Sequence, residues 1–365
     1  MLAFKGPARG SLTKKERLMA AYDPTKDPRL DPRQVPFLQL MEGMGGNLGG
    51  DIADRDSYVA EANTPEALAA MEAFAGMDDL AAVPAEGLAV ETFEMTSAPD
   101  GNTIKLLFTR PATDVVLPCV YYIHGGGMMS GSCFYGHYKT WARLLAKQGL
   151  AVLMVDFRNC LTPSSAPEIE PFPAGLNDCV SGFHWARAQA DALKINPEKV
   201  LIAGESGGGN LAIATTMKLL QDGHGDALHG LYALCPYIAG RWPQAQYPSS
   251  SENDGIFITV GNNRGAMAYG IEALEAGNPL AWPGFATEAE VKAFPPTMII
   301  VNECDPLRDE GIAFYRLLLR AGVKAQCRQV MGSVHGGDLM VSLQADISRT
   351  TARDMAGWMQ ECGVA

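Results

Sequence analysis

One serine of this chain lies in a glycine-framed sequence that suits nucleophilic catalysis. Ser206 stands in the run Gly-Glu-Ser-Gly-Gly over residues 204–208, and no other serine has glycine both two residues before and two residues after it. A strand-like run, 199–203, precedes it and a helix-like run, 210–220, follows it. A nucleophilic serine in such a context occupies a strained turn, so its neighbours must be nearly free of side chain. The sequence therefore predicts a nucleophile elbow and serine-dependent hydrolysis.

A serine hydroxyl needs a base, and the histidines are few enough to choose by elimination. With this kind of elbow the chain order is serine, acid, histidine, and only His224, His229 and His335 follow Ser206. The first two come before the strand that an acid would follow, whereas His335 lies directly after the last predicted strand. We therefore expect His335 to take the proton from Ser206.

The acid is expected on the loop that follows the predicted strand 297–302. Asp305 is the best placed residue there, although an aspartate before a proline at a helix start also serves as an ordinary N-cap. The two roles are compatible, so we expect Asp305 to orient the histidine, with Glu303 as the alternative. Asp309 should instead support the first helical turn.

Three consecutive glycines follow another predicted strand, after His124. Glycine lets backbone N–H groups approach a reacting carbon closely, and such groups stabilise a developing oxyanion. We expect the donors to be the amides of Gly125, Gly126 and Gly207. Gly207 also begins a helix, where the dipole favours negative charge.

Two further charged groups near these elements are interpreted as supporting groups. Glu205, beside the nucleophile, is interpreted most simply as a solvated carboxylate near a helix N-terminus, and its role stays open. Asp156 and Arg158 follow a predicted strand, and we expect them to form a buried or half-buried ion pair.

Strands and helices alternate from about residue 88 onward, which predicts an α/β fold with a mostly parallel, doubly wound sheet and helices on both faces. The turn sequence Pro-Asp-Gly-Asn at 99–102 predicts that an antiparallel hairpin opens the sheet. The expected strands are 88–97, 103–110, 117–124, 150–156, 200–203, 230–235, 297–302 and 324–330. The expected helices are 137–148, 174–191, 207–221, 307–321 and 337–360.

Two segments depart from this alternation and define the expected domain organisation. Residues 1–87 are punctuated by Pro, Gly and Asp and contain helical stretches such as 65–74, so we expect an N-terminal helical segment before a catalytic domain at 88–365. Within that domain, residues 236 to about 294 hold no confident strand and contain a helix near 262–276. We interpret them as an insertion above the carboxyl ends of the strands, where such sheets bind ligands.

Composition excludes several classes of partner. The 365 residues carry a net charge of −12, and an acidic surface repels nucleic acid and anionic membrane surfaces. The first 20 residues lack the apolar stretch of a signal peptide, and no run is long enough to span a membrane. The eight cysteines are scattered without a Cys-x-x-Cys pair. We therefore expect reduced, mostly buried thiols in a cytoplasmic protein, with no metal role.

Four motifs in this order resemble those of the hormone-sensitive-lipase-like esterases, also called bacterial lipolytic family IV. They are His-Gly-Gly-Gly at 124–127, Gly-Glu-Ser-Gly-Gly at 204–208, Asp-Pro-Leu-Arg-Asp-Glu-Gly at 305–311 and His-Gly at 335–336. The match covers roughly residues 88–365 and is specific, because several independent motifs agree in order. It implies an α/β-hydrolase fold with a helical cap, built from the N-terminal segment and the insertion.

The resemblance also implies the reaction: hydrolysis of short- or medium-chain carboxylic esters by the triad Ser206, Asp305 and His335, without a metal or organic cofactor. The elbow reads Glu-Ser-Gly where many members have Asp-Ser-Ala, a difference that bears on how the elbow is supported. The expected partner is a small-molecule ester, and the family is compatible with a homodimer. Two alternatives stay open: a non-catalytic small-molecule-binding protein of the same fold, and an amidase or acyltransferase that uses the same triad.

Overall fold

The computed structural model describes residues 22–43, 50–76 and 78–362, and its centre is an eight-stranded sheet in the order β1-β2-β4-β3-β5-β6-β7-β8. The strands are β1 (Leu88–Thr96), β2 (Thr103–Pro111), β3 (Leu117–Ile123), β4 (Ala151–Asp156), β5 (Ile195–Glu205), β6 (Gly230–Leu234), β7 (Thr297–Cys304) and β8 (Ala325–Val334). β2 runs antiparallel to both β1 and β4, and the remaining neighbours are parallel. The predicted mostly parallel sheet with an antiparallel hairpin at its start is confirmed.

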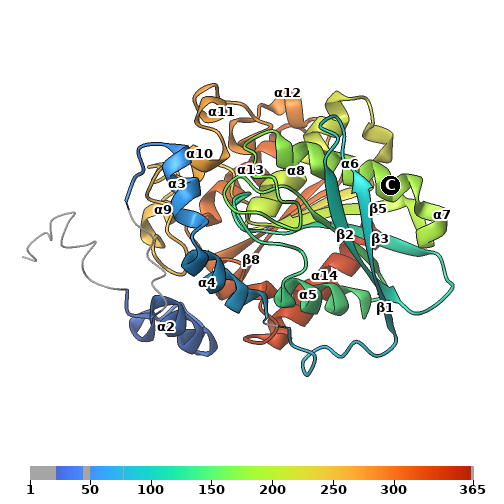
Figure 1. Cartoon of the computed structure of the whole chain (residues 1–365), viewed down its shortest axis with the longest axis horizontal. Helices are drawn as coiled ribbons and strands as arrows, with labels where there is room; N and C mark the ends of the chain where they lie inside the picture. The colour runs from blue at the N-terminus through green and yellow to red at the C-terminus, as the bar shows by residue number, and fades with distance from the viewer. Residues whose placement is uncertain (1–21, 44–49, 77, 363–365) are drawn as a thin grey trace, which may run out of the picture.

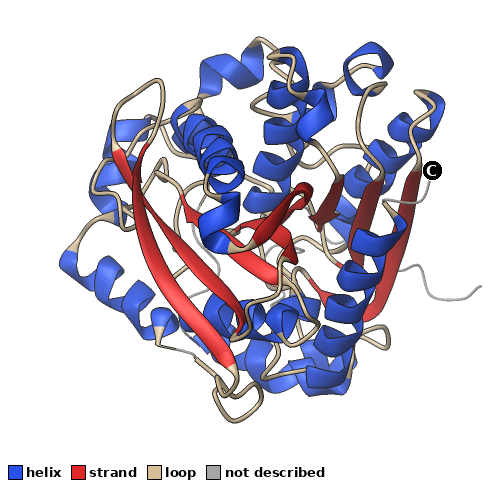
Figure 2. Cartoon of the chain, turned by 90° about the vertical axis from the view of Figure 1, so that its right-hand side faces the viewer, coloured by secondary structure: helices blue, strands red, loops and turns tan. Residues whose placement is uncertain are grey.

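Helices cover both faces of this sheet (Figures 1 and 2). One face carries α6 (Ala174–Ala188), α8 (Gly207–Gln221) and α13 (Arg308–Arg320), and the other carries α5 (Gly136–Ala146) and α14 (Ala345–Glu361). Strand residues alternate between the two cores because successive side chains point to opposite faces. In β3, for example, Tyr121 and Ile123 pack with the first set of helices, whereas Val120 and Tyr122 pack with the second.

The described part of the N-terminal segment, residues 22–43, 50–76 and 78–87, contains helices and no strand. It contains η1 (Pro24–Lys26), η2 (Pro32–Gln34), α2 (Val35–Gly43), α3 (Arg55–Ala62) and α4 (Pro65–Ala75), of which α4 confirms the predicted helix. The rest of residues 1–87 lies outside the described residues. The division into an N-terminal segment and a catalytic domain stays a prediction.

The insertion between β6 and β7 consists of short helices, of which α10 lies beside α3 of the N-terminal segment in Figure 1. They are α9 (Ser249–Glu252), α10 (Arg264–Tyr269), α11 (Ile271–Glu275), η4 (Pro283–Phe285) and α12 (Glu288–Val291). The guanidinium of Arg264 lies 4.8 Å from the centre of the Tyr58 ring, and Arg55 Nε donates to the Ala268 carbonyl oxygen at 3.2 Å. These contacts join α3 to α10, so two segments far apart in sequence pack against each other.

The helix boundaries differ from expectation in three places. The predicted helix at 262–276 is divided into α10 and α11 by Gly270, whose φ of 136° cannot continue a helix. The predicted helix at 337–360 is a short turn, η5 (Gly337–Leu339), followed by α14 from Ala345 onward. The predicted helix at 174–191 ends at Ala188, and two short elements, α7 (Ala190–Leu193) and η3 (Gly225–Ala227), complete the fold.

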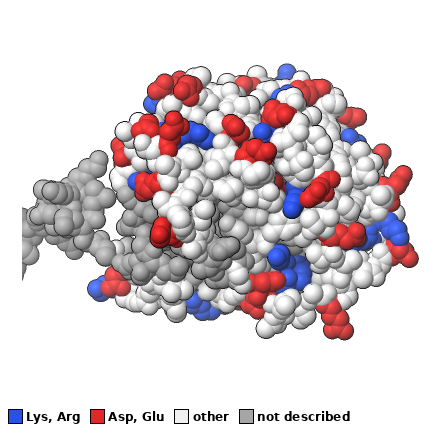
Figure 3. Space-filling view, in the orientation of Figure 1, with Lys and Arg blue, Asp and Glu red and all other residues white. Residues whose placement is uncertain are grey.

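Acidic and basic side chains are interspersed over the face drawn in Figure 3, and no continuous basic stripe crosses it. None of the helices in the described ranges is both long and apolar enough to cross a bilayer. All eight cysteines are free; six are buried, and Cys327 and Cys362 are partly exposed.

Candidate active site

Ser206 lies at the turn between β5 and α8, in the strained conformation that a nucleophile elbow needs. Its backbone angles are φ 57° and ψ −120°, a region that non-glycine residues occupy only where the surrounding structure enforces it. The packing behind the turn is close: a Cβ on Gly208 would lie 2.1 Å from the Ile123 carbonyl oxygen and 2.5 Å from that of His124. Glycine therefore lets the start of α8 press against the end of β3, and the predicted turn is confirmed.

The imidazole of His335 lies between the hydroxyl of Ser206 and the carboxylate of Asp305. Ser206 Oγ is 2.8 Å from His335 Nε2, and His335 Nδ1 is 2.9 Å from Asp305 Oδ2. The three residues directly follow β5, β8 and β7, whose carboxyl ends share one edge of the sheet. The structure therefore brings together the three side chains that chain order and elimination select.

The direction of these hydrogen bonds follows from the tautomer of His335. A proton on Nδ1 is donated to Asp305, and Nε2 is then free to accept the proton of the Ser206 hydroxyl. Burial, the largest single effect, lowers the pKa of His335, but Asp305 and Cys235 together outweigh it and hold this pKa well above its ordinary value. The charges that raise this pKa stabilise the imidazolium that forms when His335 takes the proton of Ser206.

The neighbouring residues that could have filled these roles have other partners. Asp305 also caps the following turn, because its Oδ1 accepts the Leu307 N–H at 2.9 Å, as the sequence predicts. Glu303, the alternative acid, accepts the Gly332 N–H at 2.7 Å and so joins β7 to β8. His229 Nε2 lies 2.9 Å from a backbone oxygen of α14, away from the serine.

The glycine run after β3 differs from expectation at its first position. The Gly125 N–H donates to Glu205 Oε1 at 2.7 Å, and Gly125 N also lies 2.8 Å from Tyr138 Oη. The predicted role of Gly125 as an oxyanion donor is therefore wrong, because its single proton is engaged by buried side chains. Sequence alone could not show this, since the partners come from β5 and α5.

The next two glycines form a tight turn against the start of α8. Gly126 has a φ of 102°, and its carbonyl oxygen accepts the N–H groups of Met129 and Ser130 at 3.0 and 3.1 Å. The backbone nitrogen of Gly127 would lie 2.7 Å from a Cβ placed on Gly207. Within the described ranges, no acceptor is found for the N–H groups of Gly126, Gly127 and Gly207. These amides are free to bind a negative charge beside the elbow.

Glu205 is buried, which corrects the interpretation of this residue as a solvated carboxylate. Its Oε1 accepts the Gly125 N–H and the Tyr138 hydroxyl, the latter at 2.5 Å, and its Oε2 accepts the Tyr122 hydroxyl at 2.9 Å. Burial raises the pKa of Glu205 to about 7, against the opposing effect of these hydrogen bonds. Glu205 therefore ties the nucleophile turn to the glycine loop.

The predicted ion pair between Asp156 and Arg158 is wrong. The Arg158 guanidinium donates to Asp178 at 2.9 Å and to Asp100 at 2.5 Å. The Asp156 carboxylate instead accepts two loop N–H groups at 2.8 and 2.7 Å. The planar fork of an arginine suits carboxylate partners, so Arg158 links α6 to the turn of the β1–β2 hairpin.

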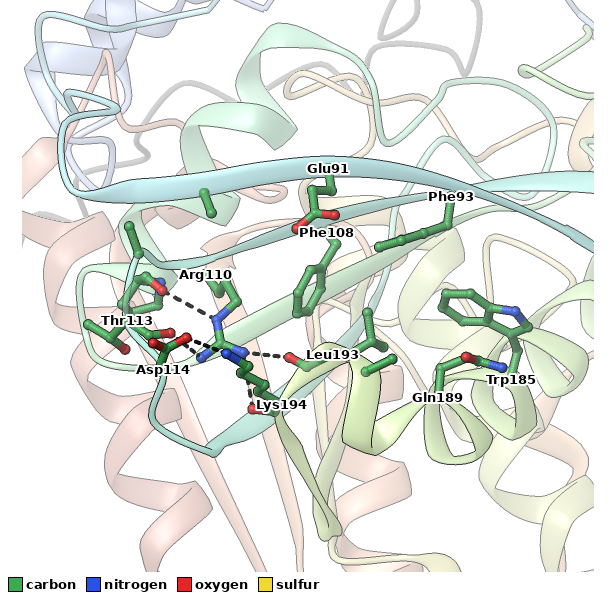
Figure 4. A pocket seen from close by; sticks show the side chains of 14 residues that line it. Glu91, Phe93, Phe108, Arg110, Thr113, Asp114, Trp185, Gln189, Leu193 and Lys194 are labelled. Atoms are coloured by element: carbon green, nitrogen blue, oxygen red, sulfur yellow. Dashed lines mark hydrogen bonds and ion pairs between the residues drawn. The ribbon is translucent and has the colours of Figure 1, made fainter.

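A pocket of about 410 Å³ opens elsewhere, between the β1–β2 hairpin and the end of α6 (Figure 4). Phe93, Phe108 and Trp185 are among its lining residues. The guanidinium of Arg110 donates hydrogen bonds to backbone carbonyl oxygens of adjoining segments at 2.5 to 3.3 Å. These bonds hold the segments together, so Arg110 has a structural role in the pocket wall. None of the lining residues belongs to the arrangement around the nucleophilic serine.

The fold and the elbow place this protein among the α/β hydrolases that use a serine nucleophile. A sequence model described as the alpha/beta hydrolase fold matches residues 120–338. The solved structure of esterase Est22 is 52% identical, with a TM-score of 0.88 over 92% of this chain and 99% of that one. Brefeldin A esterase, described as a bacterial homologue of human hormone-sensitive lipase, is 35% identical, with a TM-score of 0.82 over 93% and 96% of the two chains.

Curated relatives agree with the structural comparison. Carboxylesterase NlhH of Mycobacterium tuberculosis is 30% identical over 223 residues, which is 60% of this chain and 66% of the relative. The aligned regions span 59% and 66% of the first curated relatives, so parts of those proteins have no counterpart in the match. The chain belongs to the α/β-hydrolase fold family, in the group of esterases related to hormone-sensitive lipase.

Proposed function

We propose that this protein is a serine esterase that hydrolyses short- to medium-chain carboxylic esters through an acyl-enzyme on Ser206. The observation that carries the proposal is the pair of contacts that His335 makes, 2.8 Å to Ser206 and 2.9 Å to Asp305. Fold alone does not fix function. The reaction class is further supported by the names of the relatives, which include an esterase, a carboxylesterase and a lipase.

In the proposed mechanism, Ser206 Oγ attacks the ester carbonyl carbon while His335 Nε2 takes the hydroxyl proton. Asp305 holds the imidazole in the reactive tautomer and stabilises its charged form. The same proton then passes from Nε2 to the leaving alcohol as the acyl-enzyme forms. Water, deprotonated by His335, attacks the acyl carbon in the second half of the reaction and releases the acid.

The oxyanion of each tetrahedral intermediate is proposed to bind the amides of Gly126, Gly127 and Gly207. Gly127 takes the place expected for Gly125, whose N–H is bound to Glu205. Removal of one donor of an oxyanion hole costs about 2.7–4 kcal/mol of transition-state stabilisation in measured cases. Backbone dipoles supply this stabilisation: Gly126 and Gly127 lie in the loop after β3, and Gly207 is the first residue of α8, where the helix dipole favours negative charge.

Aromatic rings beside the elbow support a preference for compact acyl groups. The Tyr237 N–H donates to the Ser206 carbonyl oxygen at 3.1 Å, so the insertion begins next to the nucleophile. The Tyr237 ring stacks on Trp242 with centroids 4.5 Å apart, and Trp282 meets it edge-on at 5.4 Å. We propose that these rings bound the acyl side of the site and leave little room for a long chain.

A panel of p-nitrophenyl esters tests the proposal. We expect kcat/KM to be highest for the acetate or butyrate and to fall steeply at the palmitate. A matched p-nitroanilide should react far more slowly than the ester of the same acid. Absence of turnover on every ester would favour the non-catalytic binding alternative, and preference for the anilide would favour an amidase.

A further inference from the structure

A buried thiol that the proposed mechanism does not use stands beside the triad. Cys235 directly follows β6 and has a φ of 34°, which is rare for a non-glycine residue. Its N–H donates to the Ile300 carbonyl oxygen at 2.7 Å, which fixes this conformation at the end of the sheet. The Cys235 Sγ, a ring nitrogen of His335 and a carboxylate oxygen of Asp305 all lie within 4.8 Å of one another. Unusual backbone angles held in this way cluster at functional sites.

We propose that Cys235, His335 and Asp305 form a binding site for a thiophilic divalent cation such as Zn²⁺, and that the cation reversibly inhibits the enzyme. The inhibition rests on the proposed function, because two of the ligands are its triad residues. Zinc binds thiolate, imidazole and carboxylate together, with a fourth position open in many sites. Around a tetrahedral zinc, such ligand atoms lie about 3.3–3.6 Å apart, so shifts of about 1 Å complete the geometry.

Proton accounting explains why the bound cation inhibits. The thiol of Cys235 loses its proton to solvent and binds as thiolate. The Nδ1 of His335 binds the cation in place of its proton, and the neutral imidazole then carries that proton on Nε2. An Nε2–H group is a donor and cannot accept the proton of Ser206. The charges of thiolate and carboxylate balance the cation, so the buried site stays neutral.

Access and selectivity follow from burial and ligand type. Cys235 and Asp305 are fully buried, whereas His335 is 7% exposed and Ser206 is partly exposed. The cation therefore enters from the serine side, so binding should develop slowly, and a phosphonate already attached to Ser206 should block the binding of Co²⁺ as well as of Zn²⁺. Mg²⁺ prefers octahedral oxygen ligands, so it should not inhibit at the same concentration.

The experiment compares the full-length protein with Cys235→Ala and with Cys304→Ala, a matched control. Cys304 is also buried and adjoins Asp305, but it is not one of the three ligands. Ester turnover is measured at buffered free Zn²⁺, before and after addition of EDTA. Loss of a residue that only hydrogen-bonds to a metal ligand typically lowers metal affinity by roughly 10–100-fold. Loss of a direct ligand should cost at least as much, so Cys235→Ala should need at least about tenfold more Zn²⁺ for half inhibition. Cys304→Ala should behave as the wild type, and EDTA should restore all three.

A second readout does not depend on catalysis. Co²⁺ added to the wild type and to Cys304→Ala should give a thiolate-to-cobalt charge-transfer band that Cys235→Ala and Cys235→Ser lack, including when Ser206 is replaced by alanine. This outcome would stand even if the chain hydrolysed no ester. Equal inhibition of the wild type and Cys235→Ala by Zn²⁺, or no cobalt band in the wild type, would overturn the proposal.

Discussion

Replacement of Glu205 tests whether the glycine loop is held in place by a side chain next to the nucleophile. Glu205→Ala removes the acceptor of three hydrogen bonds, from the Gly125 N–H, the Tyr138 hydroxyl and the Tyr122 hydroxyl. Only the first of these comes from the glycine loop, and a hydrogen bond to a charged group is worth about 1.5–3 kcal/mol, so the loop loses restraint of about that size. If one oxyanion donor moves out of place as a result, kcat falls by about 10²–10³-fold.

Glu205→Gln is the matched control, because the amide oxygen can still accept the Gly125 N–H. The Tyr122 hydroxyl can then accept a proton from the amide nitrogen instead of donating one. We expect kcat of Glu205→Gln to stay within about tenfold of wild type, a difference of about 1.4 kcal/mol. Both variants should be assayed with p-nitrophenyl butyrate, with thermal unfolding as the check on folding.

Two results would refute this reasoning. A folded Glu205→Ala with wild-type kcat would mean that the loop needs no anchor. Equal losses in Glu205→Ala and Glu205→Gln would mean that the charge of Glu205, and not its acceptor geometry, matters for catalysis.

Two further predictions concern stability. Gly208→Ala should lower the unfolding temperature strongly, because its Cβ would lie 2.1 Å from the Ile123 carbonyl oxygen, and overpacking costs about 1–3 kcal/mol or more. The control is Gly357→Ala, whose Cβ would meet open space on α14 and which should stabilise the protein by about 0.5–1 kcal/mol. Equal unfolding temperatures for the two variants would contradict the close packing at Gly208. Glu310 of α13 is buried, and its Oε1 accepts the N–H groups of Ile238 and Ala239 at 2.7 and 3.0 Å. Burial raises the pKa of Glu310 to about 8, so its contribution to stability is present below its ordinary pKa and is lost as pH rises through 8. Denaturant unfolding at pH 5 and pH 9 should therefore show that the free energy of unfolding of Glu310→Gln, relative to that of the wild type, rises by roughly a few kcal/mol between the two pH values. A difference between the two proteins that stays the same at both pH values would contradict this.

The parts of the site that could be predicted from sequence are those fixed by backbone geometry and chain order. The elbow is predictable because a strained turn between a strand and a helix requires glycine around Ser206. His335 is predictable because few histidines follow the serine, and Asp305 because the carboxyl ends of neighbouring parallel strands meet at one edge. The mostly parallel sheet follows from the same alternation of strands and helices, whereas the strand order, with β4 between β2 and β3, was not predicted from the sequence.

The parts that could not be predicted depend on which side chains meet inside the fold. The Gly125 N–H is hydrogen-bonded only because Glu205 of β5 and Tyr138 of α5 lie next to it in the folded protein, and no local sequence pattern indicates these contacts. The same holds for Arg158, whose partners lie on α6 and the first hairpin. Helix ends inside the insertion were also missed, because short helices carry too little periodicity to locate a break such as Gly270.

The most direct test of the account is covalent labelling with an alkyl p-nitrophenyl phosphonate, read by mass spectrometry of the digested protein. We predict one phosphonyl adduct on the peptide that contains Ser206, and labelling slower by at least about 10³-fold in His335→Asn, with unchanged circular dichroism. An adduct on another residue, or equally fast labelling without the imidazole, would contradict the central claim that His335 activates Ser206.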